Sequence, residues 1–255
     1  MSSRDVSPPG VVSAIPLEGL PELEESDDLA LLLHAAAARA GGLRDADVVV
    51  VAQKAVSKVE GRVVRLADVE PSARAIELAG PDGDPRQVET ILRESVDVVR
   101  SRPPLVIAET RHGFVCASAG VDASNTPAED TVVLLPLDPD SSARRLRERL
   151  VALAAVDVGV IVSDSFGRAW RQGTTDVALG VAGITPLLDL RGTADARGRE
   201  LETTQIAVAD EIAAAAELVL GKARSVPAAI VRGVDVRGDG SAAELVMPRE
   251  RDLFR

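Results

Sequence analysis

The chain has 255 residues and a formal net charge of −11, so it lacks the clustered positive charge of a nucleic-acid-binding surface. Hydrophobic residues make up 46% and charged residues 27% of the sequence, as in an ordinary globular protein. No apolar run approaches the roughly 18 residues of a membrane-spanning helix, and the N-terminus lacks the apolar stretch of a signal peptide. The lone Cys116 excludes an internal disulfide and fits a reducing compartment. We therefore expect a cytoplasmic protein that binds neither nucleic acid nor membrane.

The N-terminal half predicts short elements that alternate irregularly. Residues 1–10 are polar and rich in Pro and Gly, so we expect them to be disordered. Residues 11–255 should form a single domain, with room for two subdomains. The Ala- and Leu-rich segment 28–40 predicts a helix, capped by Asp27 or Ser26 and ended by Gly41-Gly42. The other predicted elements are strands at 11–15, 48–52, 105–108, 114–118 and 132–135 and a helix at 85–95.

The C-terminal half predicts longer elements. A helix runs from Ser141 or Ser142 to Ala154, and a second helix occupies 207–221. Apolar runs predict buried strands at 156–162 and 227–231, while the apolar stretch 176–184 is compatible with either a helix or a strand. Because helices and strands do not alternate regularly, we predict an α+β (mixed α/β) fold rather than a regular βαβ winding.

Lysine is rare in this chain, and two of the lysines follow a predicted strand directly. Arg supplies nearly all the positive charge, and the only lysines are Lys54, Lys58 and Lys222. Lys54 and Lys58 lie four residues apart, directly after the β-branched strand 48–52. Either they bind an anionic ligand at the end of this strand, or they are solvated residues on a helix surface.

The common nucleotide-binding and zinc-binding motifs are absent. The chain has neither the Gly-rich loop of P-loop proteins nor a Gly-x-Gly-x-x-Gly turn after a strand. His34 and His112 are isolated and cannot form a zinc site. Any phosphate site must therefore be built from other residues.

Polar residues follow three of the apolar strands. Oxygen ligands on separate loops suit a hard divalent cation, and Lys and Arg bind the phosphates that such a cation bridges. Each loop by itself is also typical of a turn or a helix cap. Together they indicate metal-assisted phosphoryl chemistry that involves Gln53, Lys54, Ser57, Lys58, Asp122, Ser124, Asn125, Asp164, Ser165, Arg168 and Arg171.

Five stretches resemble the coenzyme F-420:L-glutamate ligase family. They are DADVVVVAQKAVSKVEGR at 45–62, ETRHGFVCASAGVDASN at 109–125, LPLDPDSSA at 135–143, VSDSFGRAWRQG at 162–173 and AVADEIAAAAELVLGK at 207–222. They occur in the family's order, and the resemblance covers about residues 13 to 233. Several long motifs in one order make this resemblance specific.

The resemblance implies a cytoplasmic ligase that adds one or more L-glutamates to the phospholactyl carboxylate of a deazaflavin precursor. GTP is the implied co-substrate, with Mg²⁺ or Mn²⁺ as one or two required divalent ions and K⁺ as a possible further cation. The implied route is phosphorylation of the acceptor carboxylate, followed by attack of the glutamate amine on the acyl phosphate. The resemblance also implies an intertwined homodimer, and because the chain stops at Arg255 we expect no C-terminal nitroreductase-like domain.

The resemblance also implies roles for individual residues. Lys58 and Asp164 are the implied catalytic residues. The implied metal ligands are Asp122, Asp164, Ser165 and Gln205. The implied nucleotide-binding residues are Leu20, Pro21, Glu22, Leu23, Gln53, Lys58 and Asn125. Ser165 stands where Thr is common and keeps the hydroxyl, whereas Gln53 stands where some relatives have Ser.

Two other functions remain open on composition and spacing alone. A metal-dependent phosphohydrolase could use the same Asp and Lys residues and would consume nucleotide without glutamate. A regulatory nucleotide-binding protein would bind without turnover. The sequence does not fix the number of glutamates added, the preference for GTP over ATP, or the residues that contact the deazaflavin.

Overall fold

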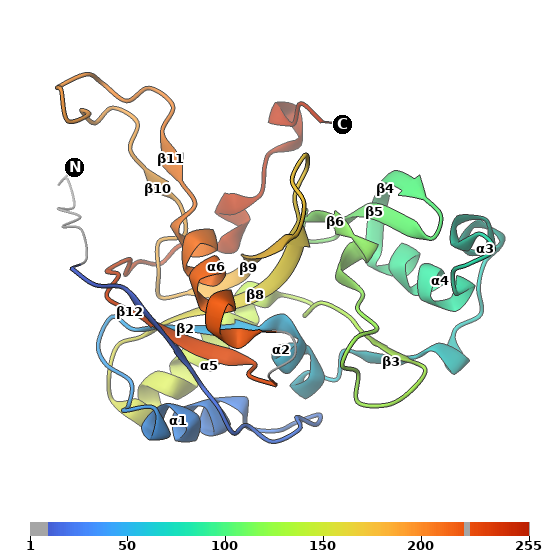
Figure 1. The fold of residues 1–255 in the computed structure, drawn as a ribbon, viewed down its shortest axis with the longest axis horizontal. Helices are drawn as coiled ribbons and strands as arrows, with labels where there is room; N and C mark the ends of the chain where they lie inside the picture. Colours follow the sequence, from blue (N-terminus) through green and yellow to red (C-terminus); the bar gives the residue numbers. More distant parts are fainter. Residues whose placement is uncertain (1–9, 222–224, 255) are drawn as a thin grey trace.

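A computed structural model describes residues 10–221 and 225–254 of the chain. The disordered tail expected at 1–10 lies outside the described residues except for Gly10, and Lys222 also lies outside them. Figure 1 shows a larger lobe around a central sheet and a smaller lobe beside it. The smaller lobe consists of residues 63–133, and the larger lobe of the remaining described residues.

The larger lobe is built on a five-stranded mixed sheet. Its strand order is β1-β12-β2-β8-β9. Neighbours pair antiparallel except β2 and β8, which are parallel. The strands span Ser13–Pro16 (β1), Ala228–Arg232 (β12), Val48–Ala52 (β2), Gly159–Gly167 (β8) and Thr174–Ala182 (β9). The central strands are rich in β-branched residues because both of their faces are buried.

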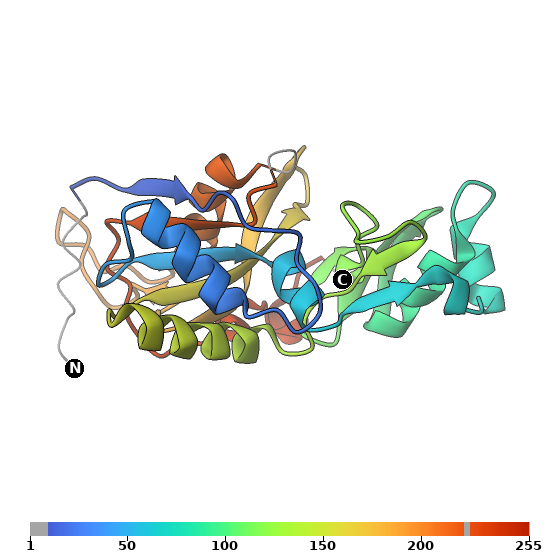
Figure 2. The same ribbon diagram turned by 90° about the horizontal axis from the view of Figure 1, so that it is seen from below.

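Helices cover both faces of this sheet (Figures 1 and 2). The helices α1 (Leu29–Arg39) and α5 (Pro139–Ala154) pack on one face, and α6 (Val208–Leu220) packs on the other. Alternate residues of β2 enter the two apolar cores, so Val49 and Val51 lie in the α1/α5 core while Val48 and Val50 lie in the α6 core. The short helix α2 (Gln53–Val59) begins directly where β2 ends.

The smaller lobe has an apolar core of its own. Helices α3 and α4 pack beside a three-stranded sheet of order β4-β5-β6, and the strands β3 and β7 form a separate pair. Buried side chains such as Leu78, Ile91 and Val106 fill this core. The elements are β3 (Val63–Arg65), α3 (Ala73–Ala79), α4 (Pro85–Glu94), β4 (Ser95–Arg102), β5 (Leu105–Thr110), β6 (Val115–Ala117) and β7 (Thr131–Val133).

Two segments extend from the larger lobe in Figure 1. One is the arm 188–206, whose base is the strand pair β10 (Leu188–Asp189) and β11 (Gln205–Ile206). The other is the C-terminal segment, which contains the 3-10 turns Ala242–Leu245 and Arg249–Arg251. Two further 3-10 turns, Leu66–Asp68 and Ser118–Gly120, lie in the smaller lobe.

A β-bulge interrupts the pairing of β8 with β9. Val162 pairs with Gly180, but the next residue, Ser163, pairs with Ala178. Leu179 is therefore an extra residue in β9, and it reverses the alternation of the side chains that precede it. As a result Ala178 lies in the α6 core.

The predicted α+β fold is confirmed, with corrections to individual elements. β8 does not end at Val162 but continues to Gly167, because residues 163–167 pair with β9. The stretch 176–184, for which the sequence left helix and strand open, belongs mainly to the strand β9. The elements β3, α3, β4 and the β10–β11 pair were not predicted from the sequence. Within the described part of the chain, none of the helices has the length and apolarity to cross a bilayer.

Candidate active site

A cavity of about 660 Å³ lies where the two lobes meet. We call it the acidic cavity. It is lined by the segment before α1, the start of α2, the 122–127 loop of the smaller lobe, the middle of β8 and the end of α6. It contains nearly every residue that the sequence singled out for binding or catalysis: Leu20, Pro21, Glu22, Leu23, Gln53, Lys54, Lys58, Asp122, Asn125, Asp164 and Ser165.

Lys54 joins the two lobes across this cavity. Its Nζ lies 2.8 Å from Oδ2 of Asp122. The same ammonium donates to the carbonyl oxygen of Ser124 at 2.9 Å and to the Ser124 hydroxyl at 2.7 Å. The backbone N–H of Ser124 donates in turn to Oδ1 of Asp122 at 2.6 Å. The ammonium group of Lys54 thus already neutralises one side of the Asp122 carboxylate.

Asp122 and Asp164 lie in the same cavity, but their pKa values are shifted in opposite directions. Burial opposes the ionisation of Asp122, but hydrogen bonds from Lys54 and Ser124 outweigh it and lower the Asp122 pKa. Burial raises the pKa of Asp164 to about 7, and the negative charges of Asp122 and Asp176 add to this effect. The backbone N–H of Ser165 and the charge of Lys54 oppose it only partly. Asp164 is therefore a carboxylate that lacks sufficient positive charge around it.

Asp176 and Glu217 belong to this site and were missed by the sequence analysis. The buried Asp176 accepts hydrogen bonds from the hydroxyls of Ser163 at 2.9 Å and Ser165 at 2.6 Å. Its backbone N–H donates to Glu217 of α6 at 3.0 Å. The available signal was that Asp176 is the one acidic residue in the apolar stretch 176–184. Its neighbours could not be identified without the pairing of β8 and β9.

The start of α2 presents a buried donor to the cavity. Gln53 is 1% exposed, and its Oε1 accepts a hydrogen bond from the Ser57 hydroxyl at 2.8 Å. Its Nε2 has no hydrogen-bond partner among the described residues. A buried donor without a partner is costly, so this amide is suited to a ligand that supplies an acceptor. Lys58, one helical turn later, forms an ion pair with Glu22.

The oxygen donors at this site suit a hard divalent cation that also binds phosphate. Asp122, Asp164 and Ser165 contribute two carboxylates and a hydroxyl to one cavity. Within the described ranges, however, no three His, Cys, Asp or Glu side chains converge closely enough to hold a metal ion by themselves. Mg²⁺ is commonly held by one or two carboxylates together with substrate phosphates. The donor set and the raised pKa of Asp164 fit that arrangement, in which the protein supplies only part of the coordination shell.

Some of the predicted residues lie elsewhere in the chain. Gln205 lies in β11 at the base of the arm, and it does not line the acidic cavity. Arg168 and Arg171 are exposed in the turn between β8 and β9 and do not line the cavity either. His112 lies in the smaller lobe, where its Nε2 is 3.0 Å from the carbonyl oxygen of Pro136.

Comparison with known proteins identifies the family of this chain. Residues 19–233 match the family model described as F420-0:Gamma-glutamyl ligase. The chain is 44% identical over 250 residues to a coenzyme F420:L-glutamate ligase of Methanothermobacter thermautotrophicus, covering 96% of this chain and 99% of that protein. It is 45% identical to the Methanopyrus kandleri protein of the same name, over 96% of this chain and 97% of that one. A third relative, from Archaeoglobus fulgidus, is 43% identical, with 96% of each chain covered. The family match includes both lobes and the acidic cavity, the three relatives cover nearly the whole chain, and the chain therefore belongs to the F420-0:gamma-glutamyl ligase family.

Proposed function

We propose that this protein joins L-glutamate to the terminal carboxylate of a coenzyme F420 precursor, using GTP and a divalent cation. The names of its relatives support the amide-forming reaction and its two substrates. The observation that carries the proposal is the acidic cavity. It brings Asp122, Asp164, Ser165 and the lysines of α2 together from distant parts of the sequence.

The cavity has suitable groups for the nucleotide. Its volume of about 660 Å³ lies in the range of small-molecule sites, about 300–1,000 Å³. Lys54 and Lys58 supply positive charge for phosphate, and the Nε2 of Gln53 supplies a buried donor. The segment 20–23 and Asn125 line the same space. We assign this cavity to GTP, with Lys58 in contact with its phosphates after release from Glu22.

Asp122, Asp164 and Ser165 are the residues that would hold Mg²⁺ or Mn²⁺. When bound, such an ion neutralises phosphate charge and polarises the transferring phosphoryl group. The protein's own contribution is to keep the Asp164 carboxylate buried and to fix Ser165 through Asp176. Gln205 stays a predicted metal ligand, and K⁺ stays a predicted additional cation.

The reaction needs an activated carboxylate because a free carboxylate is a poor electrophile. We infer that a carboxylate oxygen of the acceptor attacks the γ-phosphorus of GTP and that GDP leaves, which gives an acyl phosphate. The amine of glutamate then attacks the acyl carbon, loses a proton and expels inorganic phosphate. In this scheme Lys54 and Lys58 offset the charge that moves between the phosphates.

We also infer that the protein acts in the cytoplasm as a homodimer, as the family resemblance implies. The free, buried thiol of Cys116 is compatible with a reducing compartment. The arm 188–206 extends away from the larger lobe (Figure 1) and could exchange with a second copy. Sedimentation equilibrium would test this assembly, and a monomer at assay concentration would exclude it.

The direct test is incubation with the glutamate-free deazaflavin acceptor, L-glutamate, GTP and Mn²⁺, followed by mass spectrometry. The expected product is the acceptor with one or more added glutamyl units. Parallel reactions with ATP, or without glutamate, measure the nucleotide preference and the need for the amine. Absence of glutamyl product with all components present would contradict the proposed function.

A further inference from the structure

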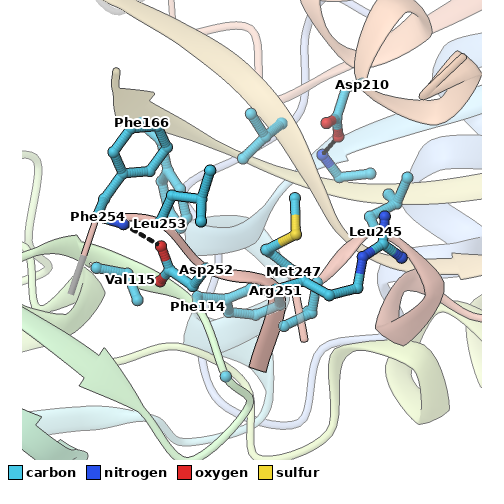
Figure 3. A pocket seen from close by; sticks show the side chains of 14 residues that line it. Phe114, Val115, Phe166, Asp210, Leu245, Met247, Arg251, Asp252, Leu253 and Phe254 are labelled. Carbon is cyan, nitrogen blue, oxygen red and sulfur yellow. Dashed lines mark hydrogen bonds between the residues drawn. The ribbon is translucent and has the colours of Figure 1, made fainter. Parts of the chain in front are cut away.

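A second cavity, of about 440 Å³, lies farther along the β8–β9 pair from the acidic cavity, towards the end of β8. We call it the aromatic cavity (Figure 3). It is formed by the start of β6, the end of β8, the start of β9, the first turn of α6 and the C-terminal segment. Its lining is largely apolar and comprises Gly113, Phe114, Val115, Phe166, Val177, Ala178, Asp210, Leu245, Val246, Met247, Arg251, Asp252, Leu253 and Phe254.

Three of the four Phe and Trp residues of the chain line this cavity, and the fourth, Trp170, contacts one of them. The sequence contains three Phe, one Trp and no Tyr. Phe114, Phe166 and Phe254 all line the cavity. The rings of Phe114 and Phe166 meet edge to face with centroids 6.1 Å apart, and Trp170 meets Phe254 in the same manner at 4.7 Å. A chain that builds its cores from aliphatic side chains has thus collected all its aromatic rings in one place.

The aromatic rings at the rim are exposed to solvent. Trp170 is 81% and Phe254 is 68% exposed, and the neighbouring Leu253 and Met247 are also exposed. Contiguous exposed apolar groups around a hollow mark a binding site more often than a folding core. Aromatic faces favour flat ring systems, which stack on them whatever their substituents. Figure 3 shows Phe166 and Phe254 on one side of the hollow and Asp210 on the opposite side.

Strand β8 lines both the aromatic cavity and the acidic cavity. Asp164 lines the acidic cavity and Phe166, two residues later, lines the aromatic cavity. Two residues along a strand span roughly 7 Å. Asp164 is also close enough to Cys116 of β6 for its charge to help raise the pKa of that thiol, after burial, to about 12. A molecule with a flat ring at Phe166 and a chain of a few atoms would therefore reach Asp164.

We propose that the aromatic cavity binds the planar deazaflavin ring system of the acceptor, with its polar chain directed along β8 towards Asp164. This inference rests on the proposed function and assigns the ring to a site of its own. The nucleotide and the acceptor ring then occupy two different cavities, both of which β8 lines near Asp164. The acceptor carboxylate is the only part of that substrate that needs to enter the acidic cavity.

The test measures binding of an acceptor fragment that keeps the deazaflavin ring and lacks the phospholactyl group. The full-length protein is titrated with this fragment, and its binding is followed by fluorescence anisotropy of the deazaflavin and by quenching of Trp170. Since loss of a stacking ring weakens binding about tenfold or more, Phe166→Ala and Phe254→Ala should each raise the Kd of the fragment by about that factor. Phe254→Tyr keeps a ring and should stay within about twofold of the wild type. Ile76→Ala removes an exposed apolar side chain from α3 in the smaller lobe and serves as the matched control.

Steady-state kinetics separate this inference from the proposed function. For Phe254→Ala, the KM for the full acceptor should rise about tenfold, while the KM for GTP stays unchanged. If wild-type protein forms glutamyl product but both Phe→Ala variants keep wild-type affinity for the fragment, the inference is wrong and the function stands. If the variants lose self-association without losing affinity for the fragment, the cavity is instead a contact between copies of this chain. If no glutamyl product forms at all, the function is wrong, and the fragment titration still decides what the cavity binds.

Discussion

Lys54 of α2 and Asp122 of the smaller lobe form an ion pair, with Nζ and Oδ2 2.8 Å apart, that connects the two lobes at the acidic cavity. Both side chains are less than a third exposed, so the interaction is only partly screened by solvent. In the absence of a metal ion, Lys54 is the nearest positive charge to this carboxylate. The pair should therefore contribute to stability as well as to the site.

Lys54→Ala should lower the melting temperature of the metal-free protein at pH 6 by about 2–4 °C, equivalent to about 1 kcal/mol. The Asp122 pKa is lowered in the folded protein, so its stabilising effect is present above the unfolded value near 3.8 and is lost as the pH falls through the folded pKa. The difference between wild type and variant should therefore shrink below about pH 4. Thermal unfolding between pH 3 and 7, in the presence of a chelator, measures it.

Arg74→Ala is the matched control for this experiment. Arg74 and Glu77 form a pair with more than half of each side chain exposed, so its loss should cost at most about 0.5 kcal/mol. An equal loss of stability in both variants would show that Lys54 makes no special contribution.

Asp164→Asn should abolish ligation and leave the fold intact, because it removes the charge of a predicted metal ligand but keeps its shape. The Asp164 pKa of about 7 lies above its unfolded value, so ionisation costs stability as the pH rises from about 4 to 7. The asparagine variant avoids this cost. Its melting temperature without metal should increasingly exceed that of the wild type over this range and then level off.

The two measurements for Asp164 test different parts of the assignment. Activity of Asp164→Asn at saturating Mn²⁺ that equals the wild type would remove Asp164 from the site. If the difference in melting temperature between Asp164→Asn and the wild type stays the same from pH 4 to 8, burial does not raise the pKa of Asp164. Ser165→Thr keeps the neighbouring hydroxyl and should retain activity.

Lys58→Ala should raise the KM for GTP by about tenfold to a hundredfold, because a charge-assisted contact contributes about 1.5–3 kcal/mol. The KM for glutamate should change little. Initial rates at varied GTP and varied glutamate measure both constants. Arg74→Ala removes an exposed positive charge from α3, outside the acidic cavity, and serves as the control. Equal rises in both constants for Lys58→Ala would indicate a structural role.

Asp176→Asn should reduce kcat by about tenfold or more while changing the KM for GTP little, because Asp176 acts by positioning other groups. It holds the hydroxyls of Ser163 and Ser165, and an asparagine can accept only one of these two hydrogen bonds well. Initial rates at varied GTP measure kcat and the KM for GTP, and initial rates at varied Mn²⁺ measure the metal requirement. If Ser165 is a metal ligand, the variant should need more Mn²⁺ for half-maximal rate, and an unchanged requirement would argue against that link.

Cleavage of GTP should be coupled to amide formation. Without the acceptor there is no carboxylate to phosphorylate, and GTP should be nearly stable. With acceptor and glutamate, released phosphate and added glutamyl units should agree at about one to one, because a ligase excludes water from its activated intermediate. A phosphate-release assay beside mass spectrometry measures both. Fast GTP hydrolysis that needs neither acceptor nor glutamate would favour a phosphohydrolase, and bound GTP that stays intact with all substrates would favour a binding protein.

The sequence predicts the elements whose local pattern is strong and uniform. The β-branched run 48–52 is β2, and the Ala- and Leu-rich segment 28–40 is α1, within a residue at each end. The polar segment 163–167 has the composition of a loop, but it is a strand because β9 supplies its hydrogen bonds from residues 174–178. Such pairing depends on partners that local propensity does not contain.

The residues of the candidate site also fall into a group that the sequence predicts and a group that only the fold reveals. Asp122 and Asp164 could be singled out because they lie in motifs, and the structure brings them to one cavity. Glu217 could not, because its role depends on where α6 crosses β9. The aromatic cavity was equally hidden, since it joins the C-terminal segment to Phe114 and Phe166 from distant parts of the chain. The scarcity of aromatic residues was visible in the composition, but their common location required the fold.

The extra residue Leu179 makes the spacing of β9, and not only its residue types, part of the site. Because of this bulge, Asp176 points towards α6 and the serines of β8. Deleting any one of the three residues between Asp176 and Gly180 would close the bulge and keep Asp176 opposite Ser165, whereas deleting two would turn the carboxylate to the opposite face of the sheet. Natural variation in length between Asp176 and Gly180 should therefore be limited to the loss of a single residue. Any redesign of β9 should therefore keep the number of residues between Asp176 and Gly180 before it changes their types.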